Sequence, residues 1–315
     1  MKMTILSPGP LTTVQDEGRF GYMNTGFSPG GAMDQGAMRL ANLLVGNNTG
    51  EGVLEMTMAG IAAIFSCDTV VAVTGADMSP TVNGKSVPMN ESILVKKGDE
   101  LKLGFAKDGL RSYLAVAGGF DLPLVMGSLS TNLKCTLGGF QGRKLAAGDE
   151  IPLKKEVSSF EKRSFSVTPA KNVLNVHVML GPQDDYFTES GIHSFFTEEY
   201  TVSPQSDRMG IRLEGVAVES KNGVDIISDG IVTGSVQIPA AGTPIIMMAD
   251  RQTTGGYAKI ATVISSDLGL LAQAKPGTKI RFHRVTEKMA ILQKKAELLK
   301  WKRVEKMFPP SFGKE

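Results

Sequence analysis

Apolar residues along this chain fall mostly in short runs of strand length, separated by turns rich in glycine and proline. The run from Ile245 to Ala249 is continuous and typical of a buried strand, whereas Val173 to Leu180 alternates between apolar and polar positions. The 36 glycines and 15 prolines break the chain too often for long helices to dominate. The pattern predicts a mostly β protein, built as a barrel or sandwich with a few short helices.

A few segments show helical spacing instead. We expect helices at about 34–45, for about a dozen residues from Gly181, at about 267–272 and at about 286–306. Asp34 and Asp267 are predicted caps, and Gly46 is a predicted stop. The glycine-rich approach to the first helix could hold an anion, or could simply lead into a capped helix. The last helix is basic, so it could pack Leu298 and Trp301 on the body or form a tail for a partner or membrane surface.

The 315 residues are enough for two domains, each with its own core. A polar stretch without strong periodicity at 154–171 is the expected boundary. We therefore predict an N-terminal β domain at 1–155, a C-terminal β-barrel domain at 172–285 and a basic helical tail at 286–315.

Composition excludes several classes of function. A net charge of +2 gives no basic excess for nucleic acid or an anionic membrane, and no apolar run approaches the roughly 20 residues that span a bilayer. The N-terminus does not resemble a signal peptide. Cys67 and Cys135 lie far apart and are interpreted as reduced, buried thiols in a cytoplasmic protein.

The common catalytic motifs are missing. The histidines at 177, 193 and 283 have no acid or cysteine at metal-site spacing, so no metal is predicted, and neither a nucleophile elbow nor a complete phosphate loop occurs. Acids, amides and arginines on turns remain, and they suit a small amide-bearing substrate. The proposed catalytic residues are Asp184, Asp229, Asp250 and Arg251. The proposed substrate-binding residues are Gln15, Asp77, Gln183, Arg208, Gln237, Gln252, Thr253, Tyr257 and Lys259.

The segment from Ser228 to Ser265 contains most of these residues. We expect a polar turn at Ser228–Gly230 and a polar loop at Asp250–Tyr257 between buried strands, where Gly255 and Gly256 let backbone amides approach a ligand. The alternative is an ordinary polar hairpin in which Asp250 and Arg251 pair with each other.

Several motifs resemble one known family. They are LTTVQDEGR (11–19), GAMD (31–34), LANLLVG (40–46), TGAD (74–77), YLAVAGG (113–119), GPQDDYF (181–187), SDRMG (206–210), SDG (228–230) and DRQTTGGY (250–257). In this order, across roughly residues 3–283, they are similar to the family of the 5-oxoprolinase C subunit, also called KipA-like or allophanate hydrolase subunit 2-like. The family is related to the carboxyltransferase domain of urea carboxylase. Gly30 stands where many members have serine.

The resemblance implies two cyclophilin-like β-barrel domains and a role as one subunit of an enzyme that is inactive alone. It implies two partner subunits, one KipI-like and the other LamB/YcsF-like. Together they would open 5-oxo-L-proline to L-glutamate, using ATP with Mg²⁺ in the assembled complex. One alternative is a biotin-dependent carboxyltransferase acting on urea or a related amide. The other is a regulatory binder that sequesters a KipI-like kinase inhibitor.

Overall fold

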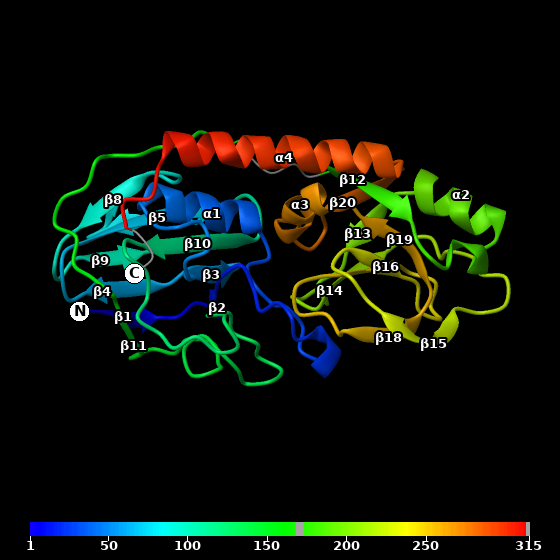
Figure 1. Cartoon of the computed structure of the whole chain (residues 1–315), viewed down its shortest axis with the longest axis horizontal. Helices are drawn as coiled ribbons and strands as arrows, with labels where there is room; N and C mark the ends of the chain where they lie inside the picture. Colours follow the sequence, from blue (N-terminus) through cyan, green and yellow to red (C-terminus); the bar gives the residue numbers. More distant parts are fainter. Residues whose placement is uncertain (168–172, 313–315) are drawn as a thin grey trace. The chain divides into compact units, whose positions relative to one another are not determined.

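The computed structural model describes residues 1–167 and 173–312, and its chain divides into two units (Figure 1). The first unit comprises Met1–Arg19, Gly30–Ala170 and Lys302–Glu315, and the second comprises Phe20–Pro29 and Lys171–Trp301. This division differs from the predicted contiguous domains in two ways. Phe20–Pro29 belongs to the second unit, and the tail at 286–315 is divided between both. Local composition could not show these assignments, because it does not reveal which of the two units a loop or tail packs against.

Two sheets form the first unit. In the order in which they pair, one contains β11 (Glu150–Pro152), β1 (Lys2–Ser7), β4 (Ala62–Phe65), β9 (Glu100–Lys102), β6 (Thr81–Val82) and β7 (Lys85–Ser86). The other contains β2 (Leu11–Gln15), β3 (Val53–Thr57), β10 (Arg111–Val116), β5 (Thr69–Gly75) and β8 (Ser92–Val95). The mostly β prediction is confirmed, but the strand pairing among the described residues closes a barrel only in the second unit.

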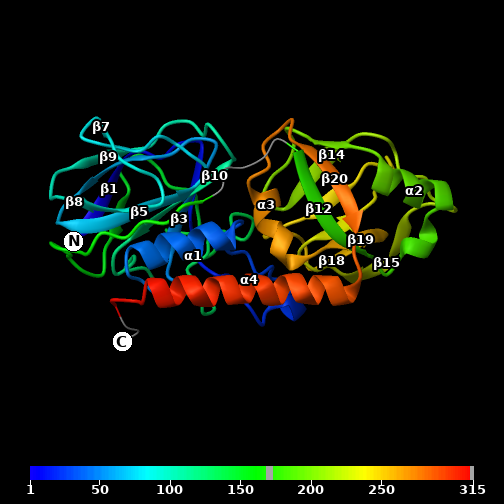
Figure 2. The same ribbon diagram turned by 90° about the horizontal axis from the view of Figure 1, so that it is seen from above.

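The core of the first unit draws on strands of both sheets. Ile5 of β1, Leu54 of β3 and Val73 of β5 are fully buried in one apolar cluster. Helix α1 (Gln35–Leu44) lies over β5 and β10, as Figure 2 shows from above. Its buried residues recur at helical spacing, which is why the sequence predicted it correctly.

Protein groups satisfy the N-terminus of α1. The Asp34 side chain accepts from the Ala37 N–H, as predicted for a cap. The Asp34 N–H donates to the Tyr113 hydroxyl, and the Met33 N–H donates to the Glu55 carboxylate, which also accepts from Tyr113. These bonds favour the capped-helix interpretation over an anion site, because they use N–H groups that an anion would need.

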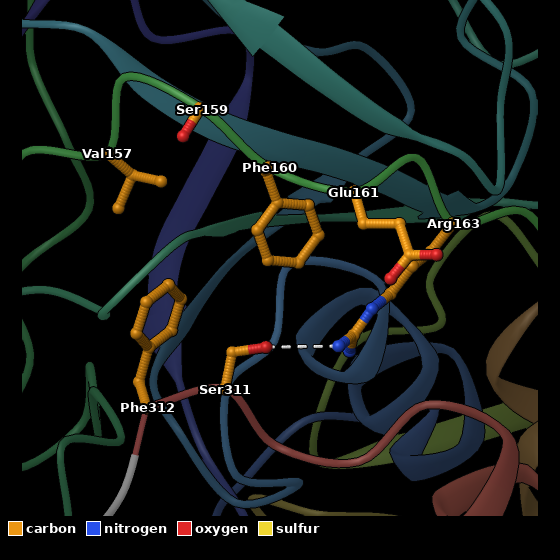
Figure 3. A pocket seen from close by; sticks show the side chains of 7 residues that line it. All are labelled: Val157, Ser159, Phe160, Glu161, Arg163, Ser311 and Phe312. Carbon is orange, nitrogen blue, oxygen red and sulfur yellow. Dashed lines mark hydrogen bonds between the residues drawn. The ribbon is translucent and has the colours of Figure 1, made fainter.

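The C-terminus of α1 is closed by residues from the far end of the chain. Gly46, with a φ of 81°, ends the helix as predicted, and its carbonyl accepts from the Ser311 N–H. The Arg163 guanidinium donates to the Leu43 and Pro309 carbonyls and to the Ser311 hydroxyl. Figure 3 shows the hollow beside the Arg163 guanidinium, where the rings of Phe160 and Phe312 lie near each other. None of the predicted site residues lines this hollow.

A seven-stranded closed barrel forms the body of the second unit. Its strands, in pairing order, are β12 (Val173–Leu180), β19 (Lys259–Val263), β16 (Ser235–Gln237), β17 (Ile245–Met247), β14 (Gly210–Glu214), β13 (Tyr200–Val202) and β20 (Lys279–Arg284). The parallel pair β12–β20 completes the ring. The alternation predicted for β12 is confirmed, because Leu174, Val176 and Val178 are buried. The predicted strands at Ile245 and Lys259 are present too.

A two-stranded ribbon stands apart from the barrel sheet. It pairs β15 (Asp225–Gly230) with β18 (Thr254–Tyr257), and Asp229 lies opposite Gly255. The predicted turn at Ser228–Gly230 and the predicted loop at Asp250–Tyr257 are therefore partly wrong, because both contain strand residues. Their polar, glycine-containing sequences lack the apolar alternation that identifies a strand, and pairing with each other supplies the missing hydrogen bonds.

The helix expected from Gly181 begins later than predicted. A short 3₁₀ turn, η2 (Asp184–Tyr186), precedes α2 (Glu189–Thr197), which is capped by the Thr188 hydroxyl. Phe195 of α2 is fully buried and stacks on Phe282 of β20, with ring centroids 4.4 Å apart. Thr188 was missed as a cap because the polar run before it also resembles a helix start.

Asp267 does not cap α3 (Leu268–Ala272) through its side chain, contrary to expectation. Its carboxylate instead accepts from the His177 N–H and lies 2.8 Å from Nδ1 of the His177 ring. His177 therefore has an acidic neighbour that sequence spacing could not reveal. The other 3₁₀ turns are η1 (Met23–Thr25) and η3 (Ser265–Asp267).

The last helix, α4 (Glu287–Met307), matches its prediction in extent. Trp301 is buried, but Leu298 is exposed, so only one of the two predicted packing residues is correct. Cys67 is buried, which raises the pKa of its thiol, whereas Cys135 is exposed and that part of the prediction was wrong. No helix in the described part of the chain is long and apolar enough to cross a bilayer.

A buried carboxylate ties β2 to the loop that follows β10. Asp16 is 7% exposed and accepts from the hydroxyls of Ser128 and Ser130 and from the N–H groups of Leu129 and Gly18. Each donor would otherwise need water or another acceptor. Asp16 is therefore a structural anchor of the first unit.

We expect Asp16→Ala to lower the free energy of unfolding of the first unit by about 3 kcal/mol or more, because several buried donors lose their acceptor at once. Native-state hydrogen exchange of the β2 amides measures this loss. Asp121→Ala, at an exposed acid of the same unit, is the matched control and should change stability by about 0.5 kcal/mol at most. Equal protection of β2 in the two variants would contradict the anchor role.

Candidate functional site

The structure separates the predicted site residues by unit. Gln15 and Asp77 belong to the first unit, and all the others belong to the second. The Gln15 amide is buried and donates to the Thr13 hydroxyl and the Thr131 carbonyl, and the Asp77 carboxylate accepts from the Ser79 N–H. These two side chains serve the local backbone, and their proposed role in substrate binding stays a prediction.

Lys259 lies at the centre of a polar group at one end of β19. Its ammonium donates to the Asp229 carboxylate at 2.8 Å, and its backbone N–H donates to the Gln183 side-chain oxygen at 3.2 Å. The Gln183 amide also lies 3.5 Å from Asp229. Gln237, opposite Lys259 in the strand pairing, completes the Lys259 cluster of Gln183, Asp229, Gln237 and Lys259. Three distant segments of chain thus meet around Lys259, and one of them, through Asp229, contacts its ammonium.

Close backbone approach makes this arrangement possible. A Cβ on Gly181 would lie 2.1 Å from the Lys259 carbonyl oxygen, so only glycine lets the chain between β12 and Gln183 pass this close to Lys259. A Cβ on Gly255 would lie 2.9 Å from the Gln237 amide nitrogen. The Gln237 amide donates to the Tyr257 carbonyl at 3.4 Å. Glycines on both sides therefore bring backbone and amide groups together around the lysine.

The two charges of the cluster differ in their access to solvent. The Lys259 side chain is 4% exposed, whereas that of Asp229 is 54% exposed. The hydrogen bond from Lys259 lowers the pKa of Asp229 below its ordinary value of 3.8, and the bond from the Gly230 N–H lowers it further. The cluster therefore presents the ionised Asp229 carboxylate to solvent beside the buried Lys259 ammonium. The carboxylate can accept a hydrogen bond, and the ammonium next to it can donate one.

Arg208 and Asp250 form a second, separate ion pair. The Arg208 guanidinium binds the Asp250 carboxylate with two bonds, Nε to Oδ2 at 2.8 Å and Nη2 to Oδ1 at 3.1 Å. The hairpin alternative, in which Asp250 pairs with Arg251, is therefore wrong. Paired to Arg208 in this way, Asp250 is positioned as a structural acid, and its proposed catalytic role stays a prediction.

Arg251 is buried and bonds differently from its neighbour. Its Nε donates to the Ile231 carbonyl at 3.1 Å, and its Nη2 lies 3.8 Å from the Met23 sulfur. Burial lowers its pKa from the ordinary value. Met23, in the Phe20–Pro29 segment, was missed as a neighbour because it lies 228 positions away and its surroundings carry no distinctive spacing.

The remaining predicted residues are less involved. Asp184 begins η2 and is half-buried, and its carboxylate makes no hydrogen bond with any residue the structure describes. The Gln252 side chain is exposed, and Thr253 contributes its carbonyl to the Ile231 N–H. Within residues 1–167 and 173–312, no three His, Cys, Asp or Glu side chains are grouped so that they could hold a metal ion.

The sequence as a whole places this chain in a class. Residues 25–284 match the family described as "Carboxyltransferase domain, subdomain A and B", and the chain belongs to this family. It is 39% identical to the 5-oxoprolinase C subunit of Escherichia coli, over 89% of this chain and 90% of that protein. It is 38% identical to the 5-oxoprolinase C subunit of Haemophilus influenzae, over 93% and 95%. The resemblance seen in the sequence motifs is thereby confirmed.

A solved structure shows the same fold. The K. lactis urea amidolyase superposes with a TM-score of 0.90 at 32% identity over 96% of this chain. The chain spans only 20% of that enzyme, so the remainder of the enzyme has no counterpart here. The similarity therefore extends to the fold of both units.

The pairing of Asp229 with Lys259 predicts an acid-shifted titration. We expect a carbon-detected NMR titration of the Asp229 carboxyl group to give a midpoint below 3.8, and we expect Lys259→Met to raise it toward that value. Because the native pKa is lower than the unfolded one, the pair stabilises the fold above the unfolded pKa, and this contribution is lost as pH falls through the native pKa.

Lys221→Met, at an exposed lysine of the same unit, is the control for that titration and should leave the Asp229 midpoint unchanged. If Lys259→Met leaves the Asp229 midpoint unchanged, the ion pair does not form in solution.

Proposed function

We propose that this chain is the C subunit of an ATP-dependent 5-oxoprolinase, which hydrolyses 5-oxo-L-proline to L-glutamate together with two partner subunits, one KipI-like and the other LamB/YcsF-like. The main support is similarity along nearly the whole length of two proteins that carry the name of this subunit. We place the complex in the cytoplasm.

The Lys259 cluster supports an amide substrate. A lactam is a cis amide, so its N–H and its carbonyl oxygen lie on the same edge of the ring. The Asp229 carboxylate and the Lys259 ammonium, 2.8 Å apart, offer an acceptor and a donor side by side. In the proposed complex, Asp229 accepts from the lactam N–H and Lys259 donates to the lactam oxygen.

Each residue then has a defined task. Lys259 stabilises negative charge at the lactam oxygen, first while that oxygen is being activated and then while water attacks the ring carbon, and its burial makes that interaction stronger than in water. Asp229 fixes the orientation of the ring, and Gln183 holds the Lys259 backbone in place. The C–N bond breaks as the tetrahedral centre collapses, and the nitrogen takes a proton and becomes the amine of glutamate. The phosphoryl group on the activated oxygen would then leave as inorganic phosphate when a second water hydrolyses the acyl phosphate.

ATP with Mg²⁺, bound in the assembled complex, would supply the phosphoryl group that activates the lactam oxygen. Because the described residues include no group suited to a metal ion, we assign no residue of this chain to ATP.

The second candidate function is carboxyl transfer to an amide such as urea, with biotin as carrier. The family description and the likeness to a urea amidolyase favour it. The same donor and acceptor pair would fit urea, which also presents N–H groups beside a carbonyl oxygen. The chain matches only 20% of that enzyme, and this candidate function would also need a biotin carrier and a carboxylase.

Mixing the subunits tests the proposal directly. Glutamate release should require ATP, 5-oxo-L-proline and all three chains, and avidin should have no effect. We expect Lys259→Met to lower the rate about 100-fold or more, because the donor at the developing charge is lost. Lys221→Met is the matched control and should retain the full rate. Glutamate release without this chain would refute the proposal, and inhibition by avidin would favour carboxyl transfer.

A further inference from the structure

Two buried arginines in the second unit have unlike partners. Arg208 is 5% exposed and Arg251 is 4% exposed. Arg208 has a carboxylate on two of its donors, whereas no Asp or Glu of the described chain forms an ion pair with Arg251. A buried guanidinium remains charged at neutral pH, so the second case is unusual.

The donors of Arg251 are incompletely used. Nε binds the Ile231 carbonyl, and Nη2 has only the Met23 sulfur at 3.8 Å, which is a weak acceptor. Nη1 is buried and has no hydrogen-bond partner among the described residues. A buried donor that is left without a hydrogen-bond partner costs free energy, and the cost is larger when the donor belongs to a charged group. The folded chain thus retains a cation with an open hydrogen-bonding position.

A structural arginine in the same chain looks different. Arg163 also forms no ion pair with an acid of the described residues, but its guanidinium donates to the Leu43 and Pro309 carbonyls and to the Ser311 hydroxyl, so it closes the end of α1. Arg251 holds one carbonyl only. The bond to the Ile231 carbonyl does not explain why a charged guanidinium is buried here, since a neutral donor could make the same bond.

The chain links Arg251 closely to the Lys259 cluster. Ile231, whose carbonyl binds Arg251, follows Asp229 by two residues. A Cβ on Gly255 would lie 2.6 Å from Cδ1 of Ile231 and 2.9 Å from the Gln237 amide nitrogen, so these groups surround one point. Arg251 is thus bonded, through the Ile231 carbonyl, to the segment that also carries Asp229.

We propose that Arg251 binds the carboxylate of the amide substrate, with Nη1 and Nη2 as donors and with the Met23 side chain moving aside when the ligand enters. The assignment rests on the proposed function for the identity of the ligand, and it adds the residue that determines preference for a lactam with a carboxylate over one without. Guanidinium and carboxylate form paired, charge-assisted hydrogen bonds, which an ammonium cannot match in geometry.

The affinities of the protein for two lactams test this assignment. By calorimetry, on the chain alone and with its partner subunits present, 5-oxo-L-proline should bind about tenfold or more tightly than 2-pyrrolidone, which is the same ring without the carboxylate. Arg251→Gln should remove this difference and leave the affinity for 2-pyrrolidone unchanged. Arg251→Lys, which keeps the charge, should retain part of it and serves as the second variant if the first does not fold.

Arg212→Gln, at an exposed arginine of the barrel, is the matched control and should preserve the preference. Equal affinity for the two lactams in the wild-type chain, or binding of neither, overturns the carboxylate site. If the two lactams bind equally and Lys259→Met abolishes the binding of 2-pyrrolidone, the amide site is still supported. Binding of 5-oxo-L-proline that depends on Arg251 and not on Lys259 would instead support the carboxylate site and refute the amide site.

Discussion

A buried ammonium must have a counter-charge, and this requirement organises the second unit. Lys259 lies on a barrel strand with its side chain almost wholly out of solvent, and the carboxylate that balances it comes from a ribbon outside the barrel. An unbalanced cation at this depth would cost several kcal/mol. The ion pair therefore holds the β15–β18 ribbon against β19, and the close approach at Gly181 and Gly255 follows from the need to bring these segments together.

The two units use their buried polar groups differently. In the first unit, the carboxylates of Asp16 and Glu55 are fully engaged with hydroxyl and backbone donors, so they serve the fold. In the second unit, Asp229 keeps half of its surface in solvent, and Arg251 keeps a donor without a partner among the described residues. Groups that are poised but incompletely satisfied are typical of binding sites, because a ligand can supply the missing partner. The Gln15 side-chain oxygen of the first unit also lacks a partner among the described residues. We favour the second unit because the charged groups with open positions, Asp229 and Arg251, lie there.

Membership of the carboxyltransferase family does not by itself choose a reaction. The chain is similar over nearly its whole length to 5-oxoprolinase C subunits, and it matches a fifth of a urea amidolyase. Under the functions we propose, both substrates are amides, and the donor and acceptor pair at Lys259 and Asp229 would suit either. The two substrates differ elsewhere, because 5-oxoproline has a carboxylate and urea has none. A shared fold does not decide the reaction, so function has to be inferred from the side chains of the site.

The sequence by itself determined the local features. Alternation predicted β12, apolar spacing with a capping aspartate predicted α1, and Asp229, Arg251 and Lys259 were among the predicted site residues. These features depend on neighbours along the chain, and so do strand and helix propensities. Tertiary structure decided the partners: Asp250 with Arg208 rather than Arg251, Asp267 with His177, and Met23 beside Arg251. Such pairs join residues tens to hundreds of positions apart, so only the folded chain can bring them together.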